Sequence, residues 1–483
     1  MLFNSMQFVL FFPAAVLGYF IIPYKWRNLW LLILSYFYYM CWRPEYALLL
    51  LLSTLVTYLS GMVISRKKAL AKPAVALSVI INLGLLGFFK YFDFIFDIVR
   101  RLCHGAGITI VHPDFDILLP VGISFYIFQS LSYTMDVYRG EVKGEKDFLK
   151  YALFVSFFPQ LVAGPIERSK NLLGQFDERH DFEYGRVRDG LFRMLWGFFL
   201  KLVLSVRLAT TVDLIYGHAE DCTGYQLLLG TVLFAFQIYC DFAGYSEIAI
   251  GSAKVLGFDL MENFRQPFFA GSCKELWNRW HISLNTWFRD YLYFPLGGSR
   301  KGKLRRYVNL MIVFLVSGLW HGANWTFVIW GGLSGLFQIL GDLLKKVRES
   351  LGALVHLKKG SMVHTVLSVI CTFMLFCMSL VFFRSQSVDE AFMIMKKIFT
   401  GFDISSVFST SPLSLGLGTF HLLILVFGLI ILFAMDLYRE KKGDMVSVFK
   451  DNKVMRWGMY YLLVTLILLS ANFGAEEFIY FRF

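Results

Sequence analysis

Long apolar runs alternate with short polar or basic segments along most of this 483-residue chain. The runs cover residues 6–22, 29–42, 46–64, 74–92, 118–137, 148–163, 191–215, 225–256, 308–316, 326–340, 363–383, 420–438 and 457–473. Most approach the length of about twenty residues that a helix needs to cross the hydrocarbon core of a bilayer. The pattern predicts an all-α, polytopic integral membrane protein with about ten to twelve transmembrane helices. A transmembrane β-barrel would instead show short segments of alternating polarity.

Two of these stretches differ from ordinary lipid-facing spans. Residues 118–137 carry several polar side chains, and residues 148–165 contain two prolines and a glycine that interrupt a helix. Irregular backbone is tolerated at membrane depth only inside the protein or along a cavity. The two stretches therefore predict re-entrant helices around a central tunnel.

Residues 262–306 form the one long stretch without a span. From Trp277 to Tyr291, apolar residues recur at three- and four-residue spacing, which is typical of one face of an amphipathic helix. Pro295 and two glycines end the pattern. We expect an interfacial helix here. The basic loop at 297–303 that follows could hold the phosphates of a coenzyme or only anionic lipid.

Short basic segments between the runs indicate the orientation of the chain. Lys25 and Arg27 follow the first run, and residues 66–72 follow the third run, two crossings later. Because basic loops favour the cytoplasmic side, both segments predict an N-terminus outside the cytoplasm. Residues 104–116 lack lysine and arginine and fit the outer side. The last run returns outward, so the C-terminus is predicted outside as well.

Composition supports this interpretation. Charged residues make up 17% of the chain, below the usual level of about a quarter in soluble proteins. The net charge of +12 lies largely in the segments between the runs, so lipid headgroups explain it better than nucleic acid does. The seven cysteines form no pattern with zinc-ligand spacing, and no metal site is expected.

Residues 317–325 place a histidine between two apolar runs. His321 is therefore an ionisable group at or near membrane depth, where such groups are costly and mark candidate functional sites. Imidazole titrates near neutrality and can take and return a proton at cellular pH. Gly318 and Gly322 leave room for a substrate, and Trp320 supplies a flat wall with one polar N–H. The alternative is a structural histidine that forms a hydrogen bond within the bundle.

Two carboxylates, Asp241 and Glu247, also lie in apolar surroundings. A buried ionisable group of this kind can belong to a functional site or to a structural ion pair. The sequence leaves both readings open for these two residues.

Six short blocks of sequence stand out in order along most of the chain. They are residues 119–126 (LPVGISFY), 158–166 (FPQLVAGPI), 241–246 (DFAGYS), 279–290 (RWHISLNTWFRD), 319–322 (LWHG) and 478–483 (FIYFRF). Together they resemble the membrane-bound O-acyltransferase family. More narrowly, they resemble its bacterial branch, which contains the alginate O-acetyltransferase membrane subunit and the teichoic-acid D-alanyl transfer membrane protein. One departure is Ser334, where relatives often have a further histidine.

This resemblance implies an enzyme that transfers an acyl group to a hydroxyl, within a single transmembrane domain at 1–483. Residues 1–116 would form N-terminal spans, 117–345 the catalytic core, and 346–483 the C-terminal spans. The implied acyl group is acetyl, with acetyl-CoA as donor substrate and no bound cofactor. The implied acceptor is a hydroxyl of an extracytoplasmic polysaccharide or of a partner protein.

The resemblance also implies a setting. It places the chain in the bacterial inner (cytoplasmic) membrane. It further implies an extracytoplasmic acetyltransferase or esterase-like partner that finishes the transfer, and association with a polysaccharide synthase complex.

The two marked positions of the family fall on His321 and His281. Moving an acyl group from a thioester to an alcohol needs a base for the hydroxyl proton and donors for the oxyanion. We hypothesise that His321 is the base and that His281 orients a substrate or shares the proton transfer. Candidate substrate-binding residues are Trp320, Asn324, Asn285, Arg289, Asp241 and Gln160. Direct transfer is favoured over a serine acyl-enzyme, because no Ser-His-Asp arrangement or Gly-x-Ser-x-Gly motif supports the latter.

Other activities stay open. D-alanyl transfer to teichoic acid would use the same chemistry. A transporter or flippase of a lipid-linked saccharide would also be polytopic with intramembrane charges, although the sequence lacks an inverted repeat. A membrane scaffold would explain the basic loops but not the two histidines. Turnover in detergent separates an acyltransferase from a flippase, because a flippase needs a sealed bilayer.

Overall fold

The computed structural model describes residues 1–113, 118–354, 356, 358, 360–403, 405, 406, 416–443 and 452–470. Within these ranges every regular element is a helix and no strand occurs, as the apolar pattern predicted. Sequence predictions for 104–116, 400–419, 439–456, 457–473 and 478–483 fall wholly or partly outside the described residues.

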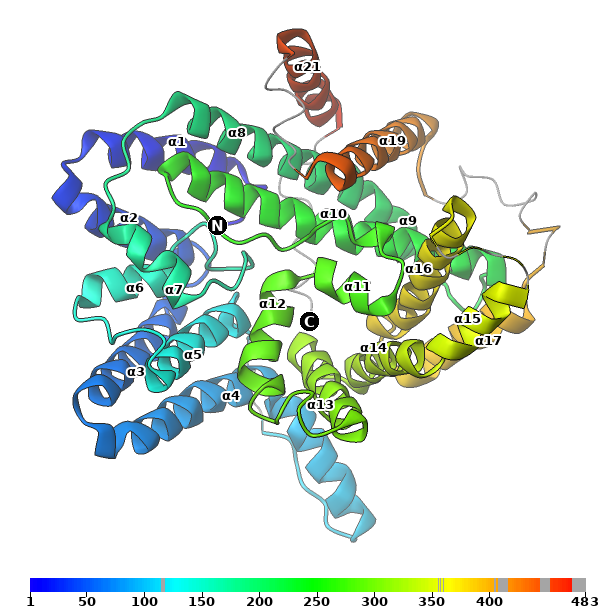
Figure 1. Cartoon of the computed structure of the whole chain (residues 1–483), viewed down its shortest axis with the longest axis horizontal. Helices are drawn as coiled ribbons and strands as arrows, with labels where there is room; N and C mark the ends of the chain where they lie inside the picture. The colour runs from blue at the N-terminus through cyan, green and yellow to red at the C-terminus, as the bar shows by residue number, and fades with distance from the viewer. Residues whose placement is uncertain are drawn as a thin grey trace.

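The helices of the first half are α1 (Met6–Ile21), α2 (Tyr24–Met40), α3 (Tyr46–Arg66), η1 (Lys68–Leu70), α4 (Ala71–Gly105), α5 (Ile123–Arg139), α6 (Phe148–Ser156), α7 (Ser169–Leu172), η2 (Gly174–Asp177), α8 (Tyr184–Phe198), η3 (Phe199–Ser205), α9 (Val206–Gly217) and α10 (Gly224–Leu256). In Figure 1 the N-terminus lies near α1, α2 and α10. The helices of the second half are η4 (Pro267–Phe269), α11 (Cys273–Arg279), α12 (Ile282–Phe288), η5 (Arg289–Tyr293), α13 (Lys303–His321), α14 (Trp325–Leu343), α15 (Lys345–Leu354), α16 (Met362–Arg384), α17 (Val388–Thr400), α19 (Thr419–Lys442) and α21 (Lys453–Ser470). Segments η3 and η5 are π-helical.

In the described residues, seven helices are long and apolar enough to cross a membrane, namely α3, α4, α10, α14, α16, α19 and α21. Helix α1 is a shorter apolar helix of 16 residues. The sequence predicted about ten to twelve crossings. The number is lower because several apolar runs form shorter helices, with 17 residues in α2 and α5 and 9 in α6. The molecule is a multi-pass helical membrane protein.

Helix α10 is buried along most of its 33 residues. It lies side by side with α8, and the two helices touch at glycines (Figure 1). A Cβ on Gly197 would meet the carbonyl oxygen of Gly244 at 2.5 Å, and one on Gly251 would meet that of Gly190 at 2.6 Å. Small residues at such crossings let two backbones approach closely, and packing then stabilises the pair.

Two polar contacts connect the region at the end of α5 with segments that lie next to basic stretches of the chain. Gly144 N donates to Ser65 Oγ at 3.0 Å, beside the basic segment that follows α3. Arg139, at the end of α5, donates to the carbonyl oxygen of Asp290 at 3.0 Å, shortly before the basic loop that precedes α13. The end of α5 and the loop that follows it thus contact both the end of α3 and the chain shortly before the basic loop at 297–303.

The stretches with internal proline and glycine fold as buried, interrupted helices, as expected. Helix α5 begins after Gly122, whose φ of 76° is left-handed, and nearly all of its residues are buried. Helix α6 ends at Ser156, and the chain continues as buried turns through Ile166. An added Cβ on Gly164 would overlap Gln160 Cα, so this turn requires glycine.

The predicted single amphipathic helix at the surface was wrong, because the structure has two short helices there whose apolar faces are buried. Helix α11 ends at Arg279, Trp280 is extended, His281 adopts a left-handed φ of 43°, and α12 begins at Ile282. The aromatic face that was expected to rest on lipid packs inside the protein, where Trp280 is 2% and His281 1% exposed.

Tertiary contacts satisfy the backbone at this break. Asn285 Nδ2 donates to the carbonyl oxygens of Trp277 and Trp280, at 2.8 and 2.6 Å. Ile282 N donates to the carbonyl oxygen of Asn263 at 2.9 Å. Periodicity within one stretch cannot reveal partners of this kind, so the sequence favoured an unbroken helix.

The glycine contact between α8 and α10 yields a test. Gly197→Ala should lower the Tm of the purified protein, because the added Cβ pushes against Gly244 and overpacking costs about 1–3 kcal/mol. Thermal unfolding in detergent measures this. The matched control is Gly84→Ala in α4, where nothing lies within 4 Å of the added Cβ. Equal Tm values for both variants would contradict the close crossing.

Candidate active site at two buried histidines

His321 is the last residue of α13 and is 4% exposed. Its imidazole lies among aromatic rings from three helices. The centroid of the imidazole is 4.9 Å from that of Trp320, 4.7 Å from Trp330 and 5.8 Å from Phe383. The ionisable group is therefore enclosed by protein rather than exposed to lipid, as intramembrane histidines usually are.

The Nδ1 atom of His321 lies 2.6 Å from the carbonyl oxygen of Ser317, one turn earlier in α13. A carbonyl oxygen can only accept, so Nδ1 carries the proton and donates it. In the neutral ring this tautomer places the lone pair on Nε2. The contact therefore orients the ring and makes Nε2 its basic atom.

His281 reaches the same place from the break between α11 and α12. Its ring centroid is 6.3 Å from that of His321, with the ring planes 80° apart. Phe242 packs edge-on against it at 4.6 Å. His281 lies outside the candidate spans; burial lowers its pKa well below the ordinary value, and His321 lowers it further. The imidazole is thus neutral at cellular pH.

Two indole N–H groups beside His321 and one hydroxyl in the first turn of α14 are buried and have no hydrogen-bond partner among the described residues. They are the indole Nε1 atoms of Trp320 and Trp330 and the hydroxyl of Thr326. Leaving a buried donor unsatisfied costs about 1–3 kcal/mol, so a cluster of such donors needs a reason. An oxygen of a bound substrate would satisfy them.

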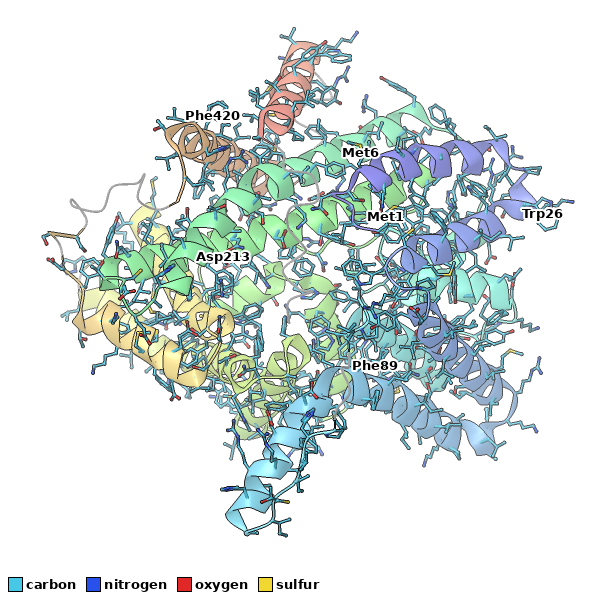
Figure 2. The ribbon with its side chains drawn as sticks, turned by 180° about the vertical axis from the view of Figure 1, so that it is seen from behind. Met1, Met6, Trp26, Phe89, Asp213 and Phe420 are labelled. Carbon is cyan, nitrogen blue, oxygen red and sulfur yellow. The ribbon has the colours of Figure 1, made fainter. Side chains whose placement is uncertain are left out.

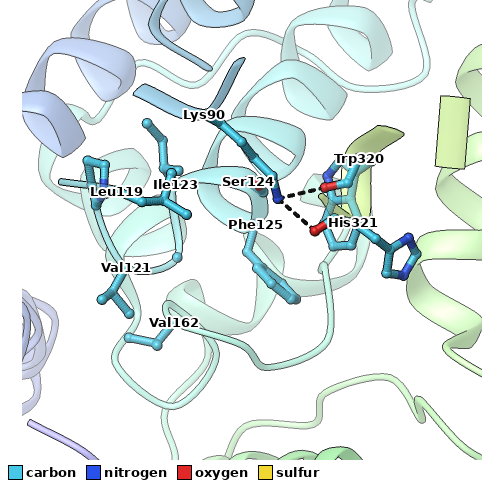
Figure 3. Close-up of a pocket in the computed structure, with 11 residues that line it drawn as sticks. Lys90, Leu119, Val121, Ile123, Ser124, Phe125, Val162, Trp320 and His321 are labelled. Atoms are coloured by element: carbon cyan, nitrogen blue, oxygen red, sulfur yellow. Dashed lines mark hydrogen bonds between the residues drawn. The ribbon is translucent and has the colours of Figure 1, made fainter. Parts of the chain in front are cut away.

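A cavity of about 40 Å³ lies on the backbone side of His321 (Figure 3). Lys90 from α4, Ser124 and Phe125 from α5, and Trp320 form part of its wall. In Figure 3 the imidazole points away from this cavity, and only the backbone of His321 faces Lys90. The cavity and the paired imidazoles are therefore on opposite sides of the end of α13.

Two predicted binding residues hold local structure near the histidines. Asn324 caps α14, because its Oδ1 accepts from Thr326 N at 3.1 Å, and its Nδ2 donates to Gln386 O. Asn285 stabilises the break beside His281, as described above. Both side chains therefore bind backbone groups close in sequence to the two histidines.

The other predicted residues make different contacts. Asp241 forms a buried ion pair with Lys201, and Gln160 Nε2 donates to Phe154 O at 3.1 Å. Arg289 is largely exposed and pairs with the adjacent aspartate. Across the described part of the chain, no group of three or more His, Cys, Asp or Glu side chains is arranged to hold a metal ion.

Phe242, Trp330 and Lys90 lie at the site without having been predicted. Lys90 had a usable signal, because it is the lone charged residue in the apolar run 74–92. Phe242 and Trp330 carried no such signal. Aromatic residues make up 18% of the chain, so a single one does not stand out in the sequence. Ser334, which replaces the further histidine of relatives, donates to the carbonyl oxygen of Trp330 at 2.9 Å.

Comparison with known proteins places this geometry in a family. Residues 143–384, which include both histidines, match the model of MBOAT, the membrane-bound O-acyltransferase family. The chain is 41% identical over 345 residues to a probable alginate O-acetylase AlgI of Pseudomonas putida, covering 70% of each protein. It is 33% identical over 430 residues to a peptidoglycan O-acetyltransferase of Helicobacter pylori, covering 82% of this chain and 79% of that one.

A third relative differs in the acyl group that its name implies. A teichoic acid D-alanyltransferase of Bacillus subtilis is 24% identical over 286 residues, covering 57% of this chain and 71% of that protein. All three relatives are acyl-transfer proteins by name, and the family match spans the helices that carry both buried histidines. The chain therefore belongs to the membrane-bound O-acyltransferase family and is an acyltransferase.

Proposed function

We propose that this protein moves an acetyl group from acetyl-CoA to a hydroxyl of an extracytoplasmic polysaccharide, or of a partner protein, with His321 as general base. The observation that carries the proposal is the hydrogen bond from His321 Nδ1 to Ser317 O, because it gives a buried imidazole one basic nitrogen. The relatives named as O-acetylases and O-acetyltransferases support acetyl as the group transferred.

The chemistry follows from this tautomer. Nε2 of His321 takes the proton of the acceptor hydroxyl while the hydroxyl oxygen attacks the carbonyl carbon of the thioester. A C–O bond forms, and the carbonyl electrons move onto oxygen as an oxyanion. The C–S bond then breaks, and the departing thiolate receives the proton from the imidazolium. The step leaves an ester and a thiol and returns His321 to its starting form.

The indole N–H groups of Trp320 and Trp330 are our candidates for stabilising the oxyanion. Both are buried beside the His321 ring and lack a partner among the described residues. A donor held ready in an apolar site stabilises developing charge without reorganisation, and losing one typically costs about 10²–10³ in rate. In this proposal Asn324 contributes by capping α14 rather than by meeting the oxyanion.

His281 would orient the substrates. Its imidazole is neutral and 6.3 Å from that of His321, so a hydroxyl or carbonyl placed between the two rings could contact both. The ring is held by packing against Phe242 and by the break in the chain that Asn285 stabilises. Holding the reacting groups in fixed positions raises the rate, because less entropy is lost on reaching the transition state.

The two substrates would approach from opposite faces of the membrane. Helix α13 begins on the side that carries the basic loops, which we assign to the cytoplasm of a bacterial inner membrane. Its 19 residues put His321 about 27 Å along the helix from that side. The hydrocarbon core is about 30 Å thick, so an outer hydroxyl could reach the base. The donor would enter through a tunnel from the cytoplasm, and both termini would lie outside.

An extracytoplasmic polymer implies further proteins. We propose that a separate acetyltransferase or esterase-like protein outside the membrane receives or finishes the transfer, close to the polysaccharide synthase complex. The support is that relatives with high coverage are named for the acetylation of bacterial polymers.

D-alanyl transfer to teichoic acid is the second candidate. One observation favours it, the similarity to the Bacillus subtilis D-alanyltransferase. The same base would serve, because the reaction again makes an ester from a thioester and a hydroxyl. Offering the purified protein acetyl and D-alanyl thioesters separates the two candidates, and turnover in detergent without a sealed bilayer excludes a flippase.

His321→Ala should lower kcat by at least about 100-fold, because general-base catalysis typically contributes 10²–10⁴-fold. Release of CoA thiol from acetyl-CoA and incorporation of labelled acetyl into alginate, by membranes that also contain the proposed extracytoplasmic partner, measure this. His104→Ala, at the exposed end of α4, is the control and should keep wild-type activity. Normal transfer by a folded His321→Ala protein would rule out this base.

Trp330→Phe should lower kcat by about 10-fold or more with little change in the KM for acetyl-CoA. The substitution keeps an aromatic ring beside His321 but removes an N–H, and such a donor acts mainly in the transition state. Trp325→Phe is the matched control, since Trp325 is 49% exposed. If both variants turn over acetyl-CoA equally well, Trp330 is not an oxyanion donor.

A further inference from the structure

The end of α13 leaves three carbonyl groups to be satisfied. The last four carbonyl groups of an α-helix have no partner within the helix. Gly322 N returns to the carbonyl oxygen of Gly318, at 3.4 Å, and the chain then becomes extended. The carbonyl oxygens of Leu319, Trp320 and His321 therefore need donors from elsewhere.

Two adjacent residues of α4 supply all of these donors. Lys90 Nζ donates to the carbonyl oxygens of Trp320 and His321, at 2.8 and 3.0 Å (Figure 3). Tyr91 donates its hydroxyl to the carbonyl oxygen of Leu319 at 2.9 Å. Figure 2 labels the neighbouring Phe89, from which the rest of α4 projects away from the body of the protein. One point on α4 thus holds the whole last turn of α13.

Carbonyl oxygens of this last turn, rather than a carboxylate, stabilise the positive charge of Lys90. Within the described residues no carboxylate forms an ion pair with Lys90. Its ammonium lies 5.8 Å from the centroid of the Trp320 ring and against the negative end of the α13 dipole. A half-buried charge in an apolar run is costly, and such a residue is a candidate for a functional role. The contacts that Lys90 makes with the end of α13 indicate what that role is.

We propose that Lys90, assisted by Tyr91, is a positioning residue that fixes the backbone of His321 and so aims its imidazole at the substrates. The inference rests on the proposed function of His321 as base. Lys90 holds the residue from the backbone side, and Ser317 holds the ring through Nδ1. Because the backbone and the ring of His321 are both held, the Nε2 atom can point in only one direction.

Geometry separates this role from direct substrate binding. The imidazole of His321 points away from the cavity that Lys90 lines, so the ammonium acts on the reaction through the backbone (Figure 3). Without the ammonium, two carbonyl groups lose their donor and the last turn of α13 loosens. A displacement of about 1 Å in a catalytic group can cost about 10²-fold in rate.

The first experiment compares variants of α4 in the acetyl-CoA and alginate assay. Lys90→Met should lower kcat about 100-fold with both KM values changed less than about twofold. Lys90→Arg should recover much of the rate, because a guanidinium can still donate to two carbonyl groups. Tyr91→Phe should lower kcat by less than Lys90→Met does, because it removes the donor of only one carbonyl group. Arg101→Met, on the exposed part of the same helix, is the control and should match wild type.

A second comparison separates positioning from folding. In a His321→Ala background, adding Lys90→Met should leave the residual rate unchanged, because the lysine acts through the missing imidazole. A further loss of similar size in that background would overturn the proposal and mark a general defect in folding. A raised KM for the acceptor with unchanged kcat would also overturn it, since Lys90 would then bind substrate.

Amide hydrogen exchange tests the anchor independently of catalysis. Lys90→Met should speed exchange across residues 318–323, whereas Lys90→Arg should not. If the wild-type protein transfers no acetyl group, the proposed function fails, yet faster exchange would still support the anchor. Unchanged exchange in Lys90→Met would overturn the anchor even in an active enzyme.

Discussion

Backbone that leaves helical geometry inside a membrane bundle must find its hydrogen-bond partners within the protein, because lipid offers none. The site of this acyltransferase depends on that constraint. At the break that carries His281, Asn285 and Asn263 satisfy the freed groups. At the end of α13, which carries His321, α4 provides the donors, chiefly through Lys90. The two imidazoles therefore stand at helix ends that neighbouring side chains hold in place.

A helix end lets a buried histidine face a residue of another element, for a geometric reason. Within a helix, each side chain is confined to one face by the spacing of the backbone. At a terminus or a left-handed residue the chain can turn, so side chains from separate elements can face each other. His281 has a φ of 43° and His321 is the last residue of α13, and their rings come within 6.3 Å. Aromatic rings around them exclude water and strengthen the interactions inside.

Buried charges in this protein fall into two kinds. Lys201 pairs with Asp241 near the crossing of α8 and α10, and Arg193 bridges Glu247 and Glu262 close by. Of the two readings that the sequence left open for Asp241, the ion pair is the one observed. Breaking such a pair would strand a buried charge, so these groups hold the bundle together. Lys90 differs, because it donates to carbonyl groups instead of pairing with a carboxylate, and those carbonyl groups belong to Trp320 and His321.

The sequence by itself determined the class of the fold and the interrupted stretches, and it singled out the two histidines as candidates, because length, hydropathy and residue chemistry are local properties. It could not determine that residues 275–295 break at Trp280 and His281, since the partners of that break include a backbone carbonyl of Asn263 that only folding brings close. The same holds for the tautomer of His321 and for the donors from α4. Those features depend on which helices touch, and only the packed tertiary structure decides that.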